Sequence, residues 1–454
     1  ANYYKPYRFL FWSDMVVAVI GAGITLVIPL IVRYITNHVI YLENPLSMIL
    51  KLALLMLGLV VLEAFCNFYQ AYYGHIMGAK MERDMRAEIF EHYQKLSFHF
   101  YDNQKVGQLL SRITNDLFEI SELLHHGPED VVISLIKFVG SFIILCTINP
   151  ALTLVTFAFL PPILIYAFLL NGRMKRAFKL RREKIADINT QIEDSLAGIR
   201  AVKSFGNEEI EMEKFAQGNE AFVDSKRISY RYMGLYHSGL GAMTTMVTIG
   251  VLVAGSVMMT HGSLKLTDLI TFLLYINNFT EPVKKLIDFT EQFQNGYTGY
   301  ERFLEIMNVD PDIKDAPDAV KLKDVKGDIT FDNVSFRYEE GLDTVLSHVD
   351  LKVHAGEYLA IVGSSGGGKT TLCSLIPRFY DVDEGRILID GTDIRKVQLK
   401  NLRDQIGIVQ QDVYLFAENV MENIRYGRPD ATDAEVIEAA KRANAHEFIM
   451  ELPN

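Results

Sequence analysis

Six long apolar runs dominate the first two thirds of the chain. An α-helix needs about 20 apolar residues to cross the ~30 Å hydrocarbon core of a bilayer. The runs approach this length, carry few charges and gather in one part of the chain, which disfavours buried helices of a water-soluble protein. They occupy residues 9–32, 49–73, 131–148, 152–170, 240–259 and 266–279. The sequence therefore predicts a six-helix transmembrane bundle.

Charge is distributed unevenly between the connections of these runs. Lys and Arg gather in residues 74–130 and 171–239, whereas the other connections are short and nearly free of basic residues. By the positive-inside rule, the N-terminus and both long connections face the cytoplasm. The net charge of −11 and the lack of a basic tract exclude nucleic acid as an expected partner.

The two long connections are predicted to continue the spans as amphipathic helices. No proline occurs between Pro45 and Pro128 or between Pro162 and Pro282, and apolar residues recur in both connections at helical spacing. A helix over residues 49–96 would be about 70 Å long, more than twice the hydrocarbon thickness. The apolar faces are Met81, Met85, Ile89, Tyr93 and Leu96 in the first connection, and Ile185, Ile188, Ile192, Leu196 and Ile199 in the second.

Short polar stretches with aromatic residues occupy residues 98–104 and 203–209, where these helices turn round. Each stretch is either a knuckle that docks on an ATP-binding domain or an ordinary loop, and the sequence leaves both open. Three charges inside the apolar runs, Asp14, Glu63 and Lys137, are costly in lipid and are candidate pathway residues. The alternative is that each lies near an interface, snorkels or pairs with another helix.

Residues 363–370 have the sequence Gly-Ser-Ser-Gly-Gly-Gly-Lys-Thr, which matches the P-loop pattern G-x-x-x-x-G-K-[ST]. The apolar run 358–362 before it predicts a buried strand, and residues 371–376 predict the opening of a helix. Glycines let consecutive backbone N–H groups turn toward a phosphate, and the start of a helix adds positive charge. Lys369 would reach the β- and γ-phosphates, and the Thr370 hydroxyl would bind Mg²⁺. ATP and Mg²⁺ are the expected cofactors.

The last third of the chain has the texture of an α/β domain. Residues 329–338, 345–353, 386–390 and 406–410 predict strands, and residues 434–445 predict an amphipathic helix. Strands and helices around a P-loop indicate an α/β P-loop ATPase domain. The predicted domains are a transmembrane domain (1–307), a polar linker (308–326) and the N-terminal part of a nucleotide-binding domain (327–454).

Further motifs surround the P-loop. Residues 332–338, Asp-Asn-Val-Ser-Phe-Arg-Tyr, resemble the opening strand and aromatic A-loop of an ABC-transporter ATPase domain. Residues 376–381 and 385–391 are similar to the next landmarks of this family, and residues 408–412 are similar to its Q-loop. With six predicted spans upstream, the whole chain resembles a bacterial ABC exporter half-transporter of the multidrug and lipid-flippase kind.

This resemblance implies roles for single residues. Tyr338 would stack on adenine. Gln411, preferred over Gln410 because it directly precedes Asp412, would contact Mg²⁺ and the attacking water. The implied catalytic residues are Lys369 and Gln411, and the implied metal ligands are Thr370 and Gln411. The implied nucleotide-binding residues are Tyr338, Gly363, Ser364, Ser365, Gly366, Gly367, Gly368, Lys369, Thr370, Thr371 and Gln411.

The implied function is that of an ATP-hydrolysing exporter subunit in the cell membrane, paired with an identical or a different second half-transporter. Amphipathic small molecules, lipids or peptides would be its substrates, as suits an apolar cavity lined by the aromatic residues of the first two runs, Phe11, Trp12, Phe65, Phe68 and Tyr72. The alternative is that these residues face lipid or a neighbouring helix. The alternative is a membrane-anchored ATP-binding regulator or an ATP-gated channel without uphill transport.

The family's signature, Walker B and switch-histidine motifs do not occur before Asn454. We therefore expect the chain as given to bind ATP without hydrolysing it competently, and the sequence to stop short of the protein's end.

Overall fold

The computed structural model describes residues 3–339, 343–410 and 413–453. It divides into two compact units. The first unit holds Ala1–Leu96 and Phe100–Asp310, and the second holds Ser97–His99 and Pro311–Asn454.

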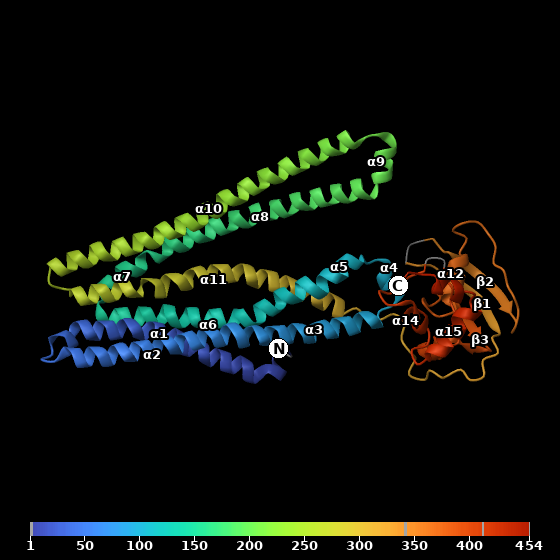
Figure 1. The fold of residues 1–454 in the computed structure, drawn as a ribbon, viewed down its shortest axis with the longest axis horizontal. Helices are drawn as coiled ribbons and strands as arrows, with labels where there is room; N and C mark the ends of the chain where they lie inside the picture. The colour runs from blue at the N-terminus through green and yellow to red at the C-terminus, as the bar shows by residue number, and fades with distance from the viewer. Residues whose placement is uncertain (1–2, 340–342, 411–412, 454) are drawn as a thin grey trace. The chain divides into compact units, whose positions relative to one another are not determined.

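The described residues of the first unit form helices joined by short connections (Figure 1). Asn149 caps one of them, because its side chain accepts a hydrogen bond from the backbone N–H of Leu152 at 2.9 Å. In chain order the helices are η1 (Lys5–Tyr7), α1 (Arg8–Asn37), η2 (Val39–Tyr41), α2 (Pro45–Tyr69), the π-helical η3 (Gln70–Gly74), α3 (His75–Lys95), α4 (Phe98–Asp102), α5 (Val106–Ser111), the π-helical η4 (Arg112–Asp116), α6 (Leu117–Ile148), α7 (Pro150–Ala158), α8 (Leu160–Ala197), α9 (Ile199–Phe205), α10 (Glu208–Thr260) and α11 (Leu266–Met307).

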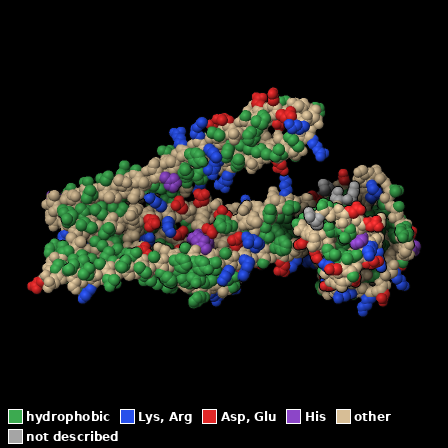
Figure 2. Space-filling model, in the orientation of Figure 1, with side chains coloured by type: hydrophobic (Ala, Val, Ile, Leu, Met, Phe, Trp, Pro, Cys, Tyr) green, Lys and Arg blue, Asp and Glu red, His purple; other side chains and the backbone are tan. Residues whose placement is uncertain are grey.

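Five helical stretches of the described chain are long and apolar enough to cross a membrane. They are Lys5–Tyr41, Pro45–Lys95, Val106–Ile148, Pro150–Ala197 and Glu208–Thr260. Many apolar side chains of this unit are exposed, and Figure 2 shows them gathered along one end of it. An exposed apolar surface of this extent suits a bilayer, and the prediction of a membrane helix bundle is confirmed.

The sixth predicted run, residues 266–279, lies in α11. Phe272, Tyr275 and Phe279 of this helix are fully buried, in a core shared with α6, α8 and α10. The run is short and contains Asp268, whose carboxylate accepts a hydrogen bond from Arg33 Nε at 2.8 Å. A sixth span therefore stays a prediction.

The first long connection forms the helix that its pattern predicts. Helical structure is continuous over Pro45–Lys95, a stretch of 51 residues that measures about 75 Å at 1.5 Å per residue. Met81, Met85 and Ile89 on α3 are almost fully buried, and they face a core to which α6 and α11 also contribute. The predicted apolar face is confirmed.

The second long connection is helical too, but its apolar face is largely open. Helices α8 and α10 run as a pair that diverges from the other helices of this unit toward α9 (Figure 1). Ile188 is buried, whereas Leu196 is 64% exposed. Between α8, α9 and the start of α10 lies a cavity of about 250 Å³, lined by Ile192, Leu196 and Phe215 among others.

The second unit is built on a small antiparallel sheet with the strand order β2-β1-β3-β4. One face of the sheet packs on α12, where Phe331 and Ile387 from the sheet join a core with Leu372 and Leu375. The elements are β1 (Ile329–Phe336), β2 (Leu346–Val353), α12 (Lys369–Leu375), β3 (Glu384–Ile389), β4 (Thr392–Asp393), η5 (Ile394–Lys396), α13 (Leu399–Asp404), α14 (Val420–Arg425), α15 (Asp433–Arg442) and α16 (His446–Met450). These bounds confirm the strands predicted at 329–338, 345–353 and 386–390 and the helix predicted at 434–445.

Two predicted strands are wrong. Residues 358–362 and 406–410 form no strand, and Tyr358, Val362 and Val409 are almost completely exposed rather than buried. A strand needs a neighbour that pairs with its N–H and C=O groups. Among the described residues, no strand of the sheet pairs with either run.

Candidate functional site

The P-loop of the second unit leads directly into α12. Gly366 and Gly368 both have φ of +80°, a left-handed conformation that glycine adopts without a steric penalty. Space is a second constraint at Gly368, because a Cβ there would lie 2.8 Å from Leu346 Cδ2. The Gly368 carbonyl accepts the hydrogen bond from Leu372 N at 2.9 Å that starts the helix.

The side chain of Lys369 folds back over this loop. Its Nζ donates hydrogen bonds to the carbonyl oxygens of Gly363, at 3.1 Å, and Ser364, at 2.6 Å. The positively charged Lys369 side chain is thus held at the opening of the loop. An ammonium group held by neutral carbonyls keeps its positive charge available to an anion that approaches the loop.

The two threonines that follow Lys369 have different surroundings. Thr370 is exposed and Thr371 is buried. The Thr371 Oγ1 lies 2.9 Å from the Tyr338 hydroxyl, so a hydrogen bond joins α12 to the segment after β1. The structure therefore brings Tyr338 to the P-loop, although Tyr338 and Thr371 are 33 positions apart in the chain.

The ring of Tyr338 is held by other aromatic rings. It makes edge-to-face contacts with Phe336, at a centroid distance of 5.0 Å, and with Tyr380, at 5.2 Å. Its half-buried position fixes the ring beside the loop. Gln411, the other predicted site residue of this region, lies outside the described residues.

These residues fit a nucleotide with its metal. The loop offers a lysine ammonium, left-handed glycines and the exposed Thr370 hydroxyl within one short stretch, and these are the groups that a polyphosphate and Mg²⁺ need. The individual roles of the residues remain predictions.

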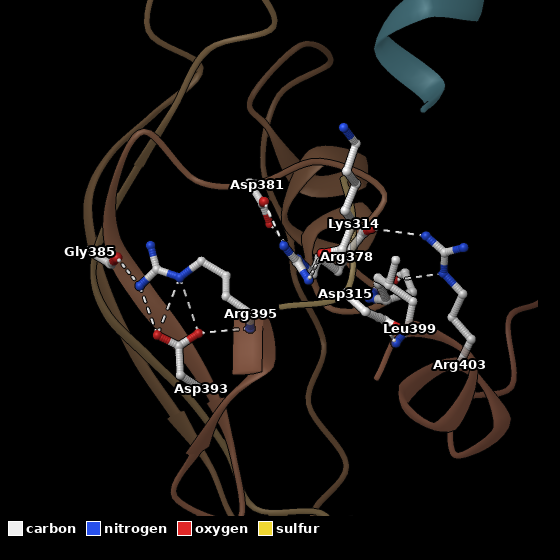
Figure 3. Close-up of polar contacts among 10 residues, drawn as sticks. Lys314, Asp315, Arg378, Asp381, Gly385, Asp393, Arg395, Leu399 and Arg403 are labelled. Atoms are coloured by element: carbon white, nitrogen blue, oxygen red, sulfur yellow. Dashed lines mark hydrogen bonds and ion pairs between the residues drawn. The ribbon is translucent and has the colours of Figure 1, made fainter. Parts of the chain in front are cut away.

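A polar cluster that we did not predict supports the end of α12 (Figure 3). Arg378, only 5% exposed and with φ of +55°, pairs with Asp381 through Nε at 2.7 Å and Nη2 at 2.9 Å. It also donates to the Lys314 carbonyl at 3.3 Å, while Arg403 donates to the Pro377 and Arg378 carbonyls, each at 3.1 Å. The only hint in the sequence is an Arg and an Asp three positions apart after Pro377.

The cluster also holds part of the predicted linker. The Asp315 carboxylate accepts a hydrogen bond from the Leu399 backbone at 2.7 Å.

Burial lowers the pKa of the Arg403 guanidinium, and the neighbouring charge of Arg378 adds to this effect. At Asp393, burial raises the pKa, but hydrogen bonds from the Arg395 side chain and backbone outweigh burial and lower it below the ordinary value.

The second unit also takes in Ser97–His99, the start of the first predicted docking stretch. The Phe98 ring lies 4.5 Å from the Phe379 ring, and Ser97 Oγ donates to Asp312 at 3.0 Å. Both interpretations of this stretch, a docking knuckle and an ordinary loop, stay predictions. The other stretch, residues 203–209, turns through Gly206 at φ +64° and leaves Phe205 78% exposed.

The three charges predicted within the apolar runs lie in different settings. Lys137 pairs with Glu281 at 3.4 Å, which supports the alternative of pairing between helices. Glu63 is half-buried. Asp14 is 1% exposed, and neither of its carboxylate oxygens has a hydrogen-bond partner in the described part of the chain.

Known proteins resemble the chain over both units. Residues 11–283 match the family described as the ABC transporter transmembrane region, and residues 346–453 match the family described as ABC transporter. The "Uncharacterized ABC transporter ATP-binding protein YwjA" of Bacillus subtilis (strain 168) is 39% identical over 453 residues, which cover 100% of this chain and 78% of that protein. The "Putative multidrug export ATP-binding/permease protein YgaD" of the same strain is 32% identical, with 100% of this chain and 79% of that protein covered.

The chain also resembles a solved structure of an ABC exporter. The structure of a bacterial Atm1-family ABC exporter with ATP bound superposes with a TM-score of 0.78 at 26% sequence identity. The match covers 98% of this chain and 78% of that chain.

Proposed function

Because the chain belongs to the ABC transporter family, we propose that it is one half of a dimeric exporter that moves amphipathic or lipid-like molecules out across the cell membrane at the expense of ATP. A unit of long apolar helices and a P-loop unit on one chain support this proposal. So do the relatives, one of which is named for multidrug export.

The observation that carries the proposal is the arrangement of Lys369 and Tyr338 around the P-loop. Lys369 donates hydrogen bonds to the carbonyls of Gly363 and Ser364. Tyr338 forms a hydrogen bond with Thr371, which is two residues after Lys369. In our proposal the loop from Gly363 to Thr371 surrounds the phosphates and Tyr338 stacks on adenine.

Magnesium belongs to the same proposed site. The Thr370 hydroxyl and Gln411 would hold the ion, which neutralises charge on the β- and γ-phosphates when it is bound. Lys369 would bind and orient the phosphates. Each of these residues acts by binding and positioning the nucleotide, which is the main contribution that a protein makes to phosphoryl transfer.

Coupling to the membrane would use the long helices. The stretch that begins at Phe98 follows α3 in the chain, and Phe98 touches Phe379. We propose that ATP brings the nucleotide-binding domains of two half-transporters together in the cytoplasm, and that this closure moves the long helices and switches the cavity from inward- to outward-facing.

Aromatic side chains on α1, α2 and η3 support an amphipathic substrate. Trp12, Phe65 and Phe68 are each more than half exposed, and the Phe68 and Tyr72 rings stack 5.8 Å apart. Flat apolar faces of this kind bind aromatic or lipid-like molecules. The same side chains also suit contact with lipid tails.

Transport into inside-out vesicles tests the proposal. Vesicles that contain the full-length protein should accumulate a fluorescent amphiphile against its gradient when MgATP is added, and a non-hydrolysable ATP analogue should not support accumulation. ATP binding without accumulation would favour a membrane-anchored regulator. An ATP-dependent flux that only runs down the gradient would favour a channel, and either result would overturn the exporter.

A further inference from the structure

Three histidines lie together in the first unit, and we call them the histidine cluster: His75, which is exposed, His125, which is buried, and His126, which is half-buried. His75 is the first residue of α3, directly after the π-helical turn η3, while the other two lie on α6. The ring centroids of His75 lie 4.9 Å from those of both other rings, and the rings of His125 and His126 are 4.1 Å apart. One ring nitrogen of each residue lies within 4.8 Å of the others.

The tautomer of His125 is fixed by a backbone contact. Its Nδ1 lies 2.8 Å from the Ser121 carbonyl oxygen, which only accepts, so Nδ1 carries the proton and donates it. In the neutral ring, Nε2 then holds a free lone pair. This is how proteins orient metal-binding histidines, with one ring N–H on a backbone carbonyl and the other nitrogen on the ion.

This lone pair is buried without a hydrogen-bond partner. His125 is 2% exposed, and its Nε2 makes no hydrogen bond to any described residue. A buried polar atom in this condition carries a desolvation cost that a bound ligand would offset.

Glu122 supplies an oxygen beside the histidines. Its carboxylate lies 3.9 Å from His125 Nε2 and 3.7 Å from His126 Nε2. Positions 122, 125 and 126 have the i, i+3 and i+4 spacing that places side chains on one face of a helix. Together with His75, α6 thus offers a set of three nitrogens and one oxygen.

A buried carboxylate lies close to His75. Both oxygens of Asp14 lack a hydrogen-bond partner among the described residues, and a Cβ added at Gly74 would lie 3.6 Å from Asp14 Oδ1. Glu129, also buried, is three residues along α6 from His126. Buried negative charge near a ligand set stabilises a bound cation.

An acidic cavity borders one residue of this set, Glu122. It has a volume of about 560 Å³, and Glu122 is part of its wall. Its other charged lining residues are Glu119, Asp130, Lys285, Asp288 and Glu291. Figure 2 shows histidine and acidic side chains gathered midway along this unit. A cavity with this excess of carboxylates attracts cations and gives an ion a path to Glu122.

We propose that His75, His125, His126 and Glu122 bind a divalent transition-metal ion, such as Zn²⁺, between α3 and α6. Imidazole nitrogens select such ions over Mg²⁺ and Ca²⁺, which take oxygen ligands. Tetrahedral Zn²⁺ with Zn–N bonds of about 2.0–2.1 Å places its nitrogens about 3.4 Å apart. The ligand nitrogens are up to 4.8 Å apart, so binding would require the more exposed His75 and His126 to rotate toward the ion.

Metal binding to the full-length protein in lipid nanodiscs tests the site without nucleotide or transport, so its failure would leave the proposed function untouched. Calorimetry with Zn²⁺ alone should give one ion per chain, and Co²⁺ should give the visible absorption of a tetrahedral site. His75→Gln, His126→Gln and Glu122→Gln should each lower the Zn²⁺ affinity at least tenfold. His92→Gln, a half-buried α3 histidine outside the cluster, should bind Zn²⁺ like the unaltered protein.

His125→Gln should abolish binding. Because His125 is buried, this substitution also disturbs the packing around it, so His75→Gln and His126→Gln decide the test. The proposal is overturned if these two variants, with unchanged melting temperatures, bind Zn²⁺ as tightly as the unaltered protein. Absence of stoichiometric binding, or a purely octahedral Co²⁺ spectrum, would overturn it as well.

Discussion

The P-loop and the histidine cluster satisfy their polar groups in opposite ways. The strongest donor of the loop, Lys369 Nζ, is bonded to two loop carbonyls, so a ligand there would exchange existing partners. In the cluster, His125 Nε2 is buried without a hydrogen bond to any described residue, as are both oxygens of the nearby Asp14, so a cation there would offset a desolvation cost. The loop can hold its shape alone, whereas the cluster is incomplete without a cation.

The two sites also differ in how the chain builds them. The loop consists of consecutive residues, and substitutions in it should act mainly on the nucleotide. The cluster joins His75 on α3 to His125 and His126 on α6, so its geometry depends on how α3 packs on α6. Substitutions that alter this packing should change the cluster without touching a ligand residue.

The largest effect is expected at the loop. Lys369→Ala removes the cation at the loop mouth and should lower the ATPase rate of the full-length protein on the order of 100-fold or more, as loss of a transition-state charge partner does. Steady-state phosphate release measures the rate. The control is Lys352→Ala, an exposed lysine on β2. Equal rates for the two variants would contradict the role of Lys369.

A smaller effect is expected at the cluster from a residue that binds nothing. A Cβ at Gly78 would lie 2.8 Å from His125 Nδ1 and 3.0 Å from Ser121 Oγ, so Gly78→Ala should displace the ring from the Ser121 carbonyl. We expect Zn²⁺ affinity to fall about tenfold, as measured by calorimetry.

Gly58→Ala on α2 is the matched control, because a Cβ there meets nothing within 4 Å. If both alanine variants bind Zn²⁺ equally well, the orientation of His125 does not matter to the site.

The smallest effect is expected at Tyr338. Tyr338→Phe keeps the ring but removes the hydrogen bond to Thr371, a loss of about 1 kcal/mol or roughly fivefold in ATP affinity. Tyr338→Ala should weaken binding further, because the stacking face is lost as well. Titration with a fluorescent ATP analogue measures both.

Tyr358→Phe, at a fully exposed tyrosine of the same unit, should leave ATP affinity unchanged. An affinity of Tyr338→Phe equal to that of this control would show that the contact with Thr371 does not support nucleotide binding.

Features with a local signal were predictable from the sequence. The 3.6-residue spacing of Met81, Met85 and Ile89 predicted a buried helical face, and the structure has it. The P-loop follows from eight consecutive residues. The apolar content of residues 358–362 does not show whether another strand is available to pair with them. Likewise, the helical spacing of Ile192 and Leu196 does not show whether another element covers these side chains. The histidine cluster depends on the register between α3 and α6, for which the sequence carries no local signal.

The π-helical turn at Gln70–Gly74 changes which side of the long Pro45–Lys95 helix each later residue faces. One additional residue in a helical turn rotates everything after it by about 100°. The residues of α3, among them Met81 and Met85 in the core, are therefore rotated relative to those of α2. Deleting a single residue from this turn would leave the composition of the helix almost unchanged, yet it would swing His75 away from α6.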